Sequence, residues 1–461
     1  MSRNELHRER LGTTDENGRR VYLYPQEVKG KWSKYRTIVY IFLILVYLIF
    51  PWIKINGIQS FLIDIPNREF FILGGHYYAH DIPLLFIIII TFILSIGFFT
   101  AVFGRFWCGW ACPQTVFIEL IFRNIEKFVE GNYRKRRQLD KSNMSLEKIL
   151  KKILKWFLFL FTSLILSHSF LAYFVKTEEL TKIIMISPKE NYGLFILMLI
   201  VSGIFLLDFG WFREQFCIIV CPYGRLQSVL MDKDSLIVAY DGKRGEPRKS
   251  IQKTERGDCI DCHKCVQVCP TGIDIRRGTQ LECIHCTRCI DVCDEVMEHV
   301  GQDKGLIKYS TERSLNEGQS KLVRPRVIIY GIILLLLSII GSFLIHKSKN
   351  IDVIFFRGTR SPYQIVNHSG EEKIINHYKA EFLYRDSRLL DLSFETDSTE
   401  VEVVSPVRNV TLQASRKKIV HIFFKFKRKI LSNGKKIITI KVRDKKDEII
   451  KKELTLVGPF N

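Results

Sequence analysis

Long apolar runs alternate with strongly charged segments along this chain of 461 residues. Five of the runs are nearly uncharged and approach the ~20 residues that an α-helix needs to cross a bilayer. These five runs are Thr37–Ile53, Ile82–Phe103, Trp156–Val175, Tyr192–Phe212 and Val327–Ile345. A buried core helix is the alternative for any single run, but it does not suit runs as uniform as Phe86–Ser95. The pattern predicts a five-helix α transmembrane bundle.

Basic residues beside these runs predict how the chain crosses the membrane. Residues 1–36 carry nine Lys and Arg, and residues 104–155 carry twelve. By contrast, residues 55–81 carry one and residues 176–192 carry three. Because positively charged flanks stay in the cytoplasm, we expect the N-terminus inside and the two poorly charged loops outside. No cleavable signal peptide is expected, because a long charged stretch precedes the first apolar run. The expected location is a bacterial inner membrane, crossed several times.

The last 116 residues show a different pattern, with apolar residues at every second position. Such alternation is typical of β-strands with one buried face. The apolar positions are Val420, Ile422, Phe424 and Phe426 in one run, and Ile438, Ile440 and Val442 in the next. Asn433-Gly434 between the two runs is a turn signal. We expect five to seven short strands that form an all-β immunoglobulin-like sandwich, placed in the periplasm by the fifth span.

The formal net charge is +21, which raises the question of nucleic-acid binding. The basic residues flank the apolar runs, and no groove-reading motif accompanies them. We therefore expect membrane lipid, and no nucleic acid, as the neighbour of this charge. All twelve cysteines lie between Cys108 and Cys293. Their confinement and spacing favour metal ligation in a reducing compartment over disulfides in an exported protein.

Eight cysteines form a double motif that is typical of bacterial two-cluster ferredoxins. Each half has three cysteines separated by two residues, followed by a fourth cysteine after three further residues. In this motif the fourth cysteine reaches across to the other cluster. The first predicted [4Fe–4S] cluster is held by Cys259, Cys262, Cys265 and Cys293, and the second by Cys269, Cys283, Cys286 and Cys289. Zinc is the alternative, but two complete sets with this crossing pattern favour iron–sulfur clusters in a compact α+β ferredoxin-like insert.

The remaining four cysteines form two equal motifs of the type C-x-x-x-C-P. Cys108 and Cys112 follow the second apolar run, and Cys217 and Cys221 follow the fourth. If each motif is helical, its two sulfurs share one face, because positions i and i+4 are neighbours on a helix. Two such helices could bring four thiols together at the inner membrane surface, where soft thiolates suit Cu(I), zinc or a further cluster. Four inert buried cysteines and disulfides within each pair remain alternatives.

Three histidines and one aspartate lie in or near the apolar runs. His76 and His80 occupy the first outer loop, and His168 lies in the outer half of the third run. They could form a metal or quinone site, but hydroxyl or carbonyl partners are the commoner explanation for such residues. Asp208, near the end of the fourth run, is expected to pair with Arg213 or with another basic residue at headgroup level.

Several of these motifs resemble the FixG/RdxA/CcoG family of cytochrome oxidase accessory proteins. The resemblance covers nearly the whole chain but is looser after the fifth run. It is carried by Val21-Tyr22 with Pro25, Phe106-Trp107-Cys108-Gly109-Trp110, Cys112-Pro113-Gln114-Thr115, Cys221-Pro222-Tyr223-Gly224-Arg225, Cys269-Pro270-Thr271-Gly272-Ile273-Asp274-Ile275-Arg276, Cys289-Ile290-Asp291-Val292-Cys293-Asp294 and Gly305-Leu306-Ile307-Lys308-Tyr309-Ser310-Thr311.

The resemblance implies a membrane-bound electron-transfer protein that assists the assembly of cbb3-type cytochrome c oxidase. It implies an oxidoreductase, a cupric reductase, with Cu(II) as substrate and Cu(I) as product for the oxidase copper site. Oxidase subunits or copper-delivery proteins would then be partners, and the electron donor is unknown. The copper would bind at Cys108, Cys112, Cys217 and Cys221. Two alternatives stay open: a quinone-linked polyferredoxin that serves a periplasmic reductase, and a non-redox assembly scaffold.

The predicted organisation is that of a multi-domain membrane protein. Residues 1–36 form a cytoplasmic segment, and residues 37–212 contain four transmembrane helices with both C-x-x-x-C-P motifs. Residues 213–326 form the cytoplasmic ferredoxin-like domain. Residues 327–345 form the fifth transmembrane helix, and residues 346–461 form the periplasmic domain.

Overall fold

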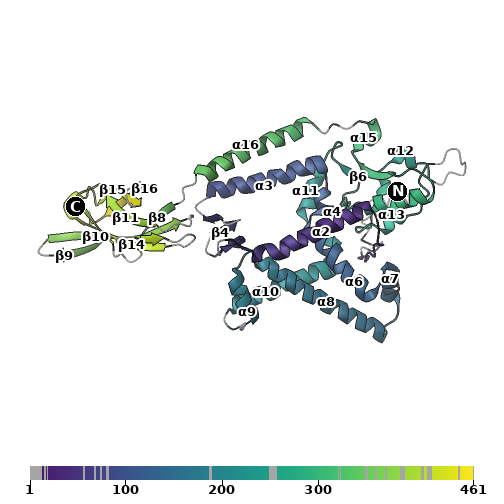
Figure 1. Cartoon of the computed structure of the whole chain (residues 1–461), viewed down its shortest axis with the longest axis horizontal. Helices are drawn as coiled ribbons and strands as arrows, with labels where there is room; N and C mark the ends of the chain where they lie inside the picture. The colour runs from purple at the N-terminus through teal and green to yellow at the C-terminus, as the bar shows by residue number, and fades with distance from the viewer. Residues whose placement is uncertain are drawn as a thin grey trace. The chain divides into compact units, whose positions relative to one another are not determined.

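The chain divides into two compact units, Met1–Ser342 and Phe343–Asn461. A computed structural model describes residues 13–14, 17, 19–55, 58–66, 69–72, 75–78, 82–185, 189, 191–248, 257–319, 321, 323–347, 351–358, 361–368, 371–384, 390–405, 410–412, 418–444 and 447–459. The first unit is mainly helical, and the second consists of strands (Figure 1).

Four of the described helical segments are long and apolar enough to cross a membrane, namely Lys31–Trp52, Phe86–Phe103, Tyr192–Phe212 and Pro325–Leu344. They correspond to α2 (Lys31–Ile49) with η1 (Phe50–Trp52), α3 (Ile82–Phe103), α10 (Tyr192–Phe205) with η4 (Leu206–Phe212), and α16 (Pro325–Lys347). Large apolar side chains on these helices, such as Phe92 and Leu335, are exposed. An exposed apolar face of this kind marks a membrane or partner surface rather than a soluble core.

The third apolar run lies in α8 (Leu146–Leu171), which is not among those four segments. This helix begins ten residues before the predicted span, with Ser145 as its N-cap, and its first three turns carry four lysines. Ser163, Ser167 and Ser169 on α8 are buried, and Ser167 shares a hydrogen bond with Ser202 of α10. The membrane crossing expected for the third apolar run, Trp156–Val175, therefore stays a prediction.

Short elements connect the long helices. Before α3 come β1 (Lys54–Ile55), β2 (Ile58–Gln59), β3 (Phe61–Asp64), β4 (Glu69–Ile72) and β5 (Gly75–Tyr78), and between α8 and α10 comes α9 (Thr177–Met185). After α3 come α4 (Phe106–Trp110), α5 (Pro113–Phe117), η2 (Ile118–Phe122), α6 (Arg123–Glu130) and α7 (Tyr133–Lys141). After η4 come η5 (Phe216–Val220) and α11 (Pro222–Leu230).

The cysteine-rich insert is a small α+β unit. It contains β6 (Ile237–Tyr240), α12 (Gly242–Gly245), α13 (Lys264–Gln267), η7 (Ile275–Arg277), α14 (Arg288–His299), β7 (Ile307–Ser310) and α15 (Glu312–Glu317). Strands β6 and β7 pair antiparallel, with Ile237 opposite Ser310. Val238, Ile273, Ile290 and Met297 form its core together with the cysteines. Most of the apolar side chains in this small core therefore surround the cysteine sulfurs.

The insert is attached to the beginning of α2. The carboxylate of Asp291, on α14, accepts hydrogen bonds from the backbone N–H groups of Trp32 and Ser33 at 3.1 and 2.7 Å. These N–H groups have no partner within the helix, so an acidic side chain satisfies both their hydrogen bonds and the helix dipole. Gly30 makes the approach possible, because a Cβ atom there would lie 2.2 Å from the Asp291 carboxyl carbon.

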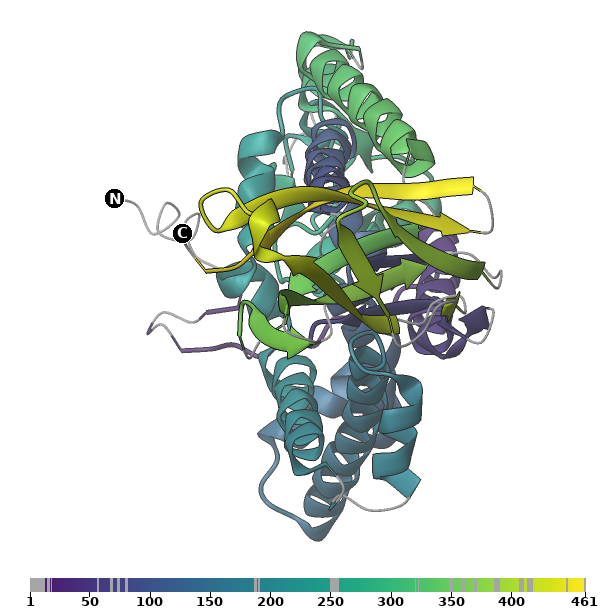
Figure 2. The ribbon, with the colours of Figure 1, turned by 90° about the vertical axis from the view of Figure 1, so that its left-hand side faces the viewer.

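The second unit contains two antiparallel sheets around one core (Figure 2). One sheet contains β8 (Ile351–Arg357), β9 (Gln364–His368), β10 (Glu371–Tyr384), β12 (Val401–Val404) and β14 (Lys418–Lys427). The other contains β11 (Leu390–Thr396), β13 (Val410–Leu412), β15 (Lys435–Asp444) and β16 (Asp447–Val457). The turn η8 (Arg428–Ile430) follows β14.

The alternation read from the sequence matches the burial in β14 and β15. Ile422 and Phe424 of β14 and Ile440 of β15 are fully buried. The nine described strands exceed the predicted five to seven. Asn433 and Gly434 have positive φ, which fits the predicted turn, yet the strands on either side of them belong to different sheets. The immunoglobulin type of this unit stays a prediction.

Candidate iron–sulfur and membrane-edge cysteine sites

The eight cysteines of the insert surround two adjacent cavities. One cavity is lined by Cys259, Cys262, Cys265 and Cys293, and the other by Cys269, Cys283, Cys286 and Cys289. These are the two sets that the sequence predicts. Cys265 also lines the second cavity, so the two spaces share a wall. We refer to them as the first and the second cluster cavity.

The loops that carry the first three cysteines of each set have the same backbone conformation. In the first loop, Asp261 and His263 have φ of 58° and 57°. In the second, His285 and Thr287 occupy the equivalent positions on either side of the middle cysteine, with φ of 53° and 64°. Left-handed residues are uncommon outside glycine, so four of them at matched positions indicate a specific curl. This curl turns three sulfurs of each loop toward one space.

The chemistry of the donor set fits an iron–sulfur cluster in each cavity. All twelve cysteines are free thiols, and burial raises the pKa of Cys265 and of Cys293 to about 12. Such thiols ionise when a metal cluster supplies the compensating positive charge. Among the described residues, no three His, Cys, Asp or Glu side chains lie close enough to hold a single metal ion. This holds for all twelve cysteines alike, so the preference for a polynuclear cluster over one zinc ion rests on the crossing pattern of the two complete cysteine sets.

Buried arginines stand beside the second cluster cavity. The guanidinium of Arg36, on α2, donates to the carbonyl oxygen of Cys286. Arg288, next to Cys289, forms an ion pair with Glu119 of η2. Beside the first cluster cavity, Arg276 is instead paired with Asp261 and with Asp274, the latter at 2.7 Å. The second cavity thus has the more positive surroundings, a factor that influences cluster potentials.

The membrane-edge thiols are Cys108 of α4, Cys217 of η5, and Cys112 and Cys221, which are the N-cap residues of α5 and α11. The prediction that each pair shares one helical face is wrong. Cys112 and Cys221 have extended backbones with ψ of 125° and 109°. The residue before a proline avoids the helical region, so Pro113 and Pro222 start new helices instead.

The four membrane-edge thiols are nevertheless neighbours. Burial raises the pKa of Cys108 to about 12, and the nearby Cys112 and Cys221 add to the effect. Burial also raises the pKa of Cys217, with contributions from the other three thiols. The two motifs are therefore brought together as the sequence predicts, although by a different local geometry. The sulfurs are half-buried and free.

Two buried glutamines border this site, and sequence reasoning missed both. Gln227 of α11 is fully buried, and its Oε1 accepts from the Cys108 thiol at 3.3 Å. Gln114, between the first motif and η2, donates from Nε2 to Asp208 at 2.9 Å and to the carbonyl of Arg213 at 3.2 Å. The expected side-chain pair of Asp208 with Arg213 is therefore wrong. Only an alignment or a structure reveals such partners.

The first C-x-x-x-C-P motif packs directly on the loop of the second cluster cavity. A Cβ atom at Gly109 would lie 2.4 Å from the carbonyl oxygen of Ile284 and 2.9 Å from that of His285. The indole N–H of Trp110 donates to the Tyr309 hydroxyl at 3.0 Å, and this hydroxyl donates to the His285 carbonyl at 3.3 Å. Glycine is the residue that permits such a close approach of two backbones.

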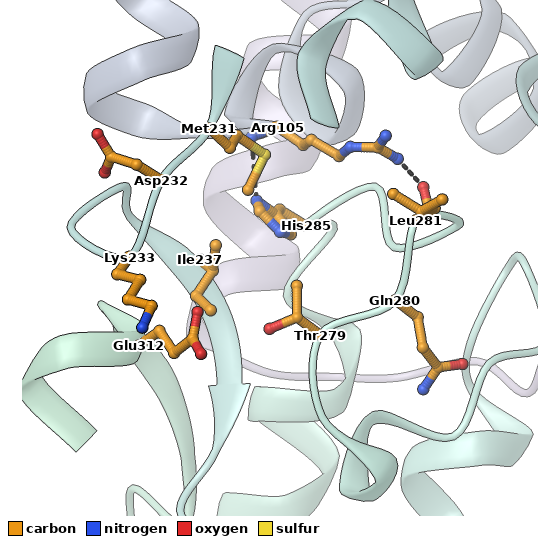
Figure 3. A pocket seen from close by; sticks show the side chains of 10 residues that line it. All are labelled: Arg105, Met231, Asp232, Lys233, Ile237, Thr279, Gln280, Leu281, His285 and Glu312. Carbon is orange, nitrogen blue, oxygen red and sulfur yellow. Dashed lines mark hydrogen bonds between the residues drawn. The ribbon is translucent and has the colours of Figure 1, made fainter. Parts of the chain in front are cut away.

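Arg105 joins both motifs to the same loop. Its guanidinium donates to the carbonyl oxygen of Leu281 (Figure 3). It also donates to the carbonyl oxygen of Gly224, at the start of α11. Its backbone N–H donates to Nδ1 of His285 at 3.2 Å. Burial, with a smaller effect of Arg105, lowers the pKa of His285 to about 3. This imidazole is therefore neutral, with its proton on Nε2, because Nδ1 accepts.

A cavity of about 240 Å³ lies beside this junction. Figure 3 shows the side chains around it, which include both cations and carboxylates. They are Arg105, Met231, Asp232, Lys233, Ile237, Thr279, Gln280, Leu281, His285 and Glu312. His285 also lines the second cluster cavity, so the two spaces have a side chain in common.

A buried ionic network surrounds the site. Burial alone would raise the pKa of Glu119, but Arg123, Arg288 and Arg36 outweigh it and hold this pKa at about 2. Arg123 also contacts Glu214, three residues before Cys217, at 3.5 Å. Charged side chains thus connect the second cluster loop with the segments before and after the membrane-edge thiols.

A metal or quinone site at the three histidines stays a prediction. Nδ1 of His168 lies 2.7 Å from the carbonyl oxygen of Leu164, one turn earlier, which is the ordinary partner for such a residue. His76 belongs to β5, where it pairs with Phe71 of β4. His80 lies outside the described residues.

Ligand replacement tests the two predicted sets. We expect anaerobically purified protein to contain about eight irons per chain, and either Cys259→Ser or Cys286→Ser to lose about four of them. Iron and sulfide analysis with electron paramagnetic resonance (EPR) measures the change. His299→Ala, at an exposed position of α14, is the control. Full iron content in both cysteine variants would contradict the assignment.

Two family comparisons match this chain. Residues 212–312 match the 4Fe-4S dicluster domain, and residues 84–136 match a 4Fe-4S binding domain. The first range contains the eight cysteines of the insert together with Cys217 and Cys221, and the second contains Cys108 and Cys112. The chain therefore carries iron–sulfur domains, as the sequence indicates.

Curated relatives include RdxA and RdxB of Cereibacter sphaeroides and the nitrogen fixation protein FixG of Rhizobium meliloti. The chain is 34 % identical to RdxA over 63 % of its length and 62 % of RdxA, and 37 % identical to RdxB over 67 % of its length and 68 % of RdxB. It is 34 % identical to FixG over 63 % of its length, but over only 57 % of FixG.

One solved structure, a FixG-related protein from Vibrio parahaemolyticus, matches 24 % of this chain and 97 % of that chain, at 13 % identity and a TM-score of 0.20. The evidence for the family lies in the identities to RdxA, RdxB and FixG and in the cysteine domains. The chain belongs to the FixG/RdxA family of iron–sulfur electron-transfer proteins.

Proposed function

We propose that this protein assists the assembly of cbb3-type cytochrome c oxidase by reducing Cu(II) to Cu(I) at the membrane-edge thiols. The observation that carries the proposal is the contact between Gly109 and the Ile284–His285 backbone. It lies one residue from Cys108 on one side and one residue from Cys286 on the other. An electron leaving the second cluster cavity would therefore reach the membrane-edge thiols across a single packed interface.

The chemistry of the thiols supports a role in copper reduction. Soft thiolates select Cu(I) over Cu(II), so they favour the reduced product. In the resting protein burial keeps Cys108 and Cys112 neutral, because it raises the pKa of both. Metal binding would release these protons, since a thiolate is the ligand. Each Cu(II) takes up one electron, and one reduced cluster supplies it.

The proposed topology follows the charge distribution. The N-terminus and the ferredoxin-like insert would face the cytoplasm, and the second unit the periplasm. The insert carries all the cluster thiols, which suits a reducing compartment, whereas the second unit has no cysteine. Five spans, including part of α8, are required for this arrangement. Oxidase subunits or copper-delivery proteins would receive the product.

Reduction of copper by the purified protein is the direct test. Protein with chemically reduced clusters, freed of excess reductant, should convert Cu(II) to Cu(I), followed with a Cu(I)-specific chelator. Serine at all four membrane-edge positions should lower the rate about tenfold or more, since it removes the soft ligands. Met144→Ala removes an exposed sulfur elsewhere and should have no effect. An unchanged rate in the serine variant would reject this site.

The cavity of Figure 3 favours a second candidate, a quinone-linked polyferredoxin that serves a periplasmic reductase. The cavity lies at the end of α3 and shares His285 with the second cluster cavity. A quinol headgroup would find both hydrogen-bond donors and carboxylates there. Rapid reduction of the clusters by a quinol, with copper unchanged, would favour this candidate over the first.

A further inference from the structure

A large cleft lies next to Cys269 of the second cluster set. It measures about 970 Å³ and lies between residues 21–25, helix α7 and the segment 266–272. Cys269, one of the second set, is among its lining residues. We propose that this cleft is the docking site of an acidic one-electron carrier protein, which delivers electrons to the cluster held by Cys269. The inference needs the chain to be an electron-transfer protein but does not depend on copper.

The charge of α7 identifies the kind of partner. Five of its nine residues are basic and one is acidic. Arg134, Arg137 and Lys141 line the cleft and are exposed. The single acid, Asp140, already accepts hydrogen bonds from Tyr24 and Lys152. An exposed cationic wall without free carboxylates attracts a negatively charged protein and speeds its encounter.

Residues 21–25 form another part of the cleft lining, which contains two anchored tyrosines. Tyr22 donates to Glu126 at 3.2 Å, and its ring lies 5.3 Å from that of Tyr24. The backbone N–H of Gln26 donates to the carbonyl of Gln267 at 2.9 Å, which fixes this segment to the cluster loops. Anchored tyrosines provide contact area at little entropic cost, as at many protein interfaces.

Accessibility of the ligand set supports entry at this point. Four cluster cysteines, Cys259, Cys265, Cys283 and Cys286, are at most 9 % exposed. Cys269, Cys289 and Cys293 are half-buried, and of these three Cys269 is the one that lines the cleft; its thiol lies 3.4 Å from the Thr271 hydroxyl. Cys262 is also exposed. The arginines beside it are paired with Asp258 and Asp261, however, so their charges are balanced and they attract an acidic partner less than α7 does. A cationic wall next to an accessible cluster cysteine therefore points to the Cys269 side.

The proposed step is a simple electron transfer. The reduced carrier loses one electron, and one oxidised cluster gains it; no bond is formed or broken and no proton moves. The probe for this carrier is a plant-type [2Fe–2S] ferredoxin, an acidic protein with a low-potential centre. A small reductant, the methyl viologen radical cation, needs no docking surface and serves as the reference.

Charge reversal on α7 is the test. In full-length protein in detergent, the triple variant Arg134→Glu, Arg137→Glu and Lys141→Glu should slow cluster reduction by reduced ferredoxin about tenfold or more at low salt. Its rate should also lose the salt dependence of the parent protein. Reduction by methyl viologen should not fall. Lys429→Glu, Lys451→Glu and Lys452→Glu, exposed positions in the second unit, make the same change in net charge and should leave the rate unchanged.

Three results would overturn the proposal. The first is an unchanged ferredoxin rate in the α7 variant, especially if Lys264→Glu beside Cys262 slows it instead. The second is an effect that appears only in vesicles containing phosphatidylglycerol, which would assign the cations to lipid headgroups. The third applies if the triple variant loses iron. The milder pair Arg134→Gln and Arg137→Gln then replaces it, and an unchanged rate of cluster reduction by ferredoxin in this pair would overturn the proposal. The ferredoxin assay contains no copper, so its outcome is independent of whether the protein reduces copper.

Discussion

Replacing Glu126 with glutamine should lower the free energy of unfolding by about 3–5 kcal/mol. Glu126 is 2 % exposed and contacts Arg213 at 2.6 and 3.1 Å, Arg136 at 2.9 Å and Lys155 at 3.8 Å. Its removal leaves three buried cations without their shared partner. The loss should be large because an uncompensated charge in a low-dielectric interior is costly.

The direction of the Glu126 pKa agrees with this expectation. Burial would raise the pKa, but Arg213 above all holds it at about 2, so the ionised form is strongly favoured in the folded protein. The unfolding midpoint in detergent, followed by circular dichroism, measures the effect. Glu147→Gln is the matched control, because Glu147 is exposed and pairs with Lys151 one turn away. Equal, small shifts in both variants would show that the network contributes little.

Adding one methyl group at Gly109 should uncouple the cluster loop from the membrane-edge thiols. The new Cβ atom would lie 2.4 Å from the Ile284 carbonyl oxygen, which belongs to the backbone and cannot rotate away. One of the two segments must therefore shift. We expect Gly109→Ala to reduce the rate of copper reduction about tenfold or more, since small displacements of reacting groups have effects of this size.

The controls separate this effect from a general loss of structure. Gly97→Ala adds the same methyl group in α3, where no described atom outside its own helix backbone lies within 4 Å, and should leave the rate unchanged. Iron content of Gly109→Ala, and its cluster reduction by methyl viologen, should stay close to those of the parent protein. Normal copper reduction in this variant would mean that electrons leave the clusters by another path.

The local patterns of the sequence predicted much of this structure. The spacing of the eight cysteines identified the two sets that line the two cavities, because a loop of fixed length determines which sulfurs can face one space. Alternation in β14 was equally informative, since Ile422 and Phe424 point inward for the same reason that they alternate with polar residues. In both cases the residues of one short segment are enough to predict which side chains face the same space.

Contacts between distant segments could not be predicted in this way. The approach of Gly109 to His285, and the bonds from Arg105 to Leu281 and Gly224, join residues 119 to 176 positions apart, and no periodicity records them. The helical geometry expected for the C-x-x-x-C-P motifs failed for a local reason, the proline after each second cysteine. The partner of Asp208 was wrong because a buried glutamine took the place of the expected arginine.

The cap that Asp291 provides for α2 has a consequence for biogenesis. The first candidate span is synthesised early, yet the carboxylate that completes its first turn is made 258 residues after Ser33. That carboxylate lies on α14 between Cys289 and Cys293, which belong to different cluster sets. Helix α14 therefore carries both cluster ligands and the N-terminal cap of α2. If the clusters are not inserted and α14 does not form, the first turn of α2 lacks its cap.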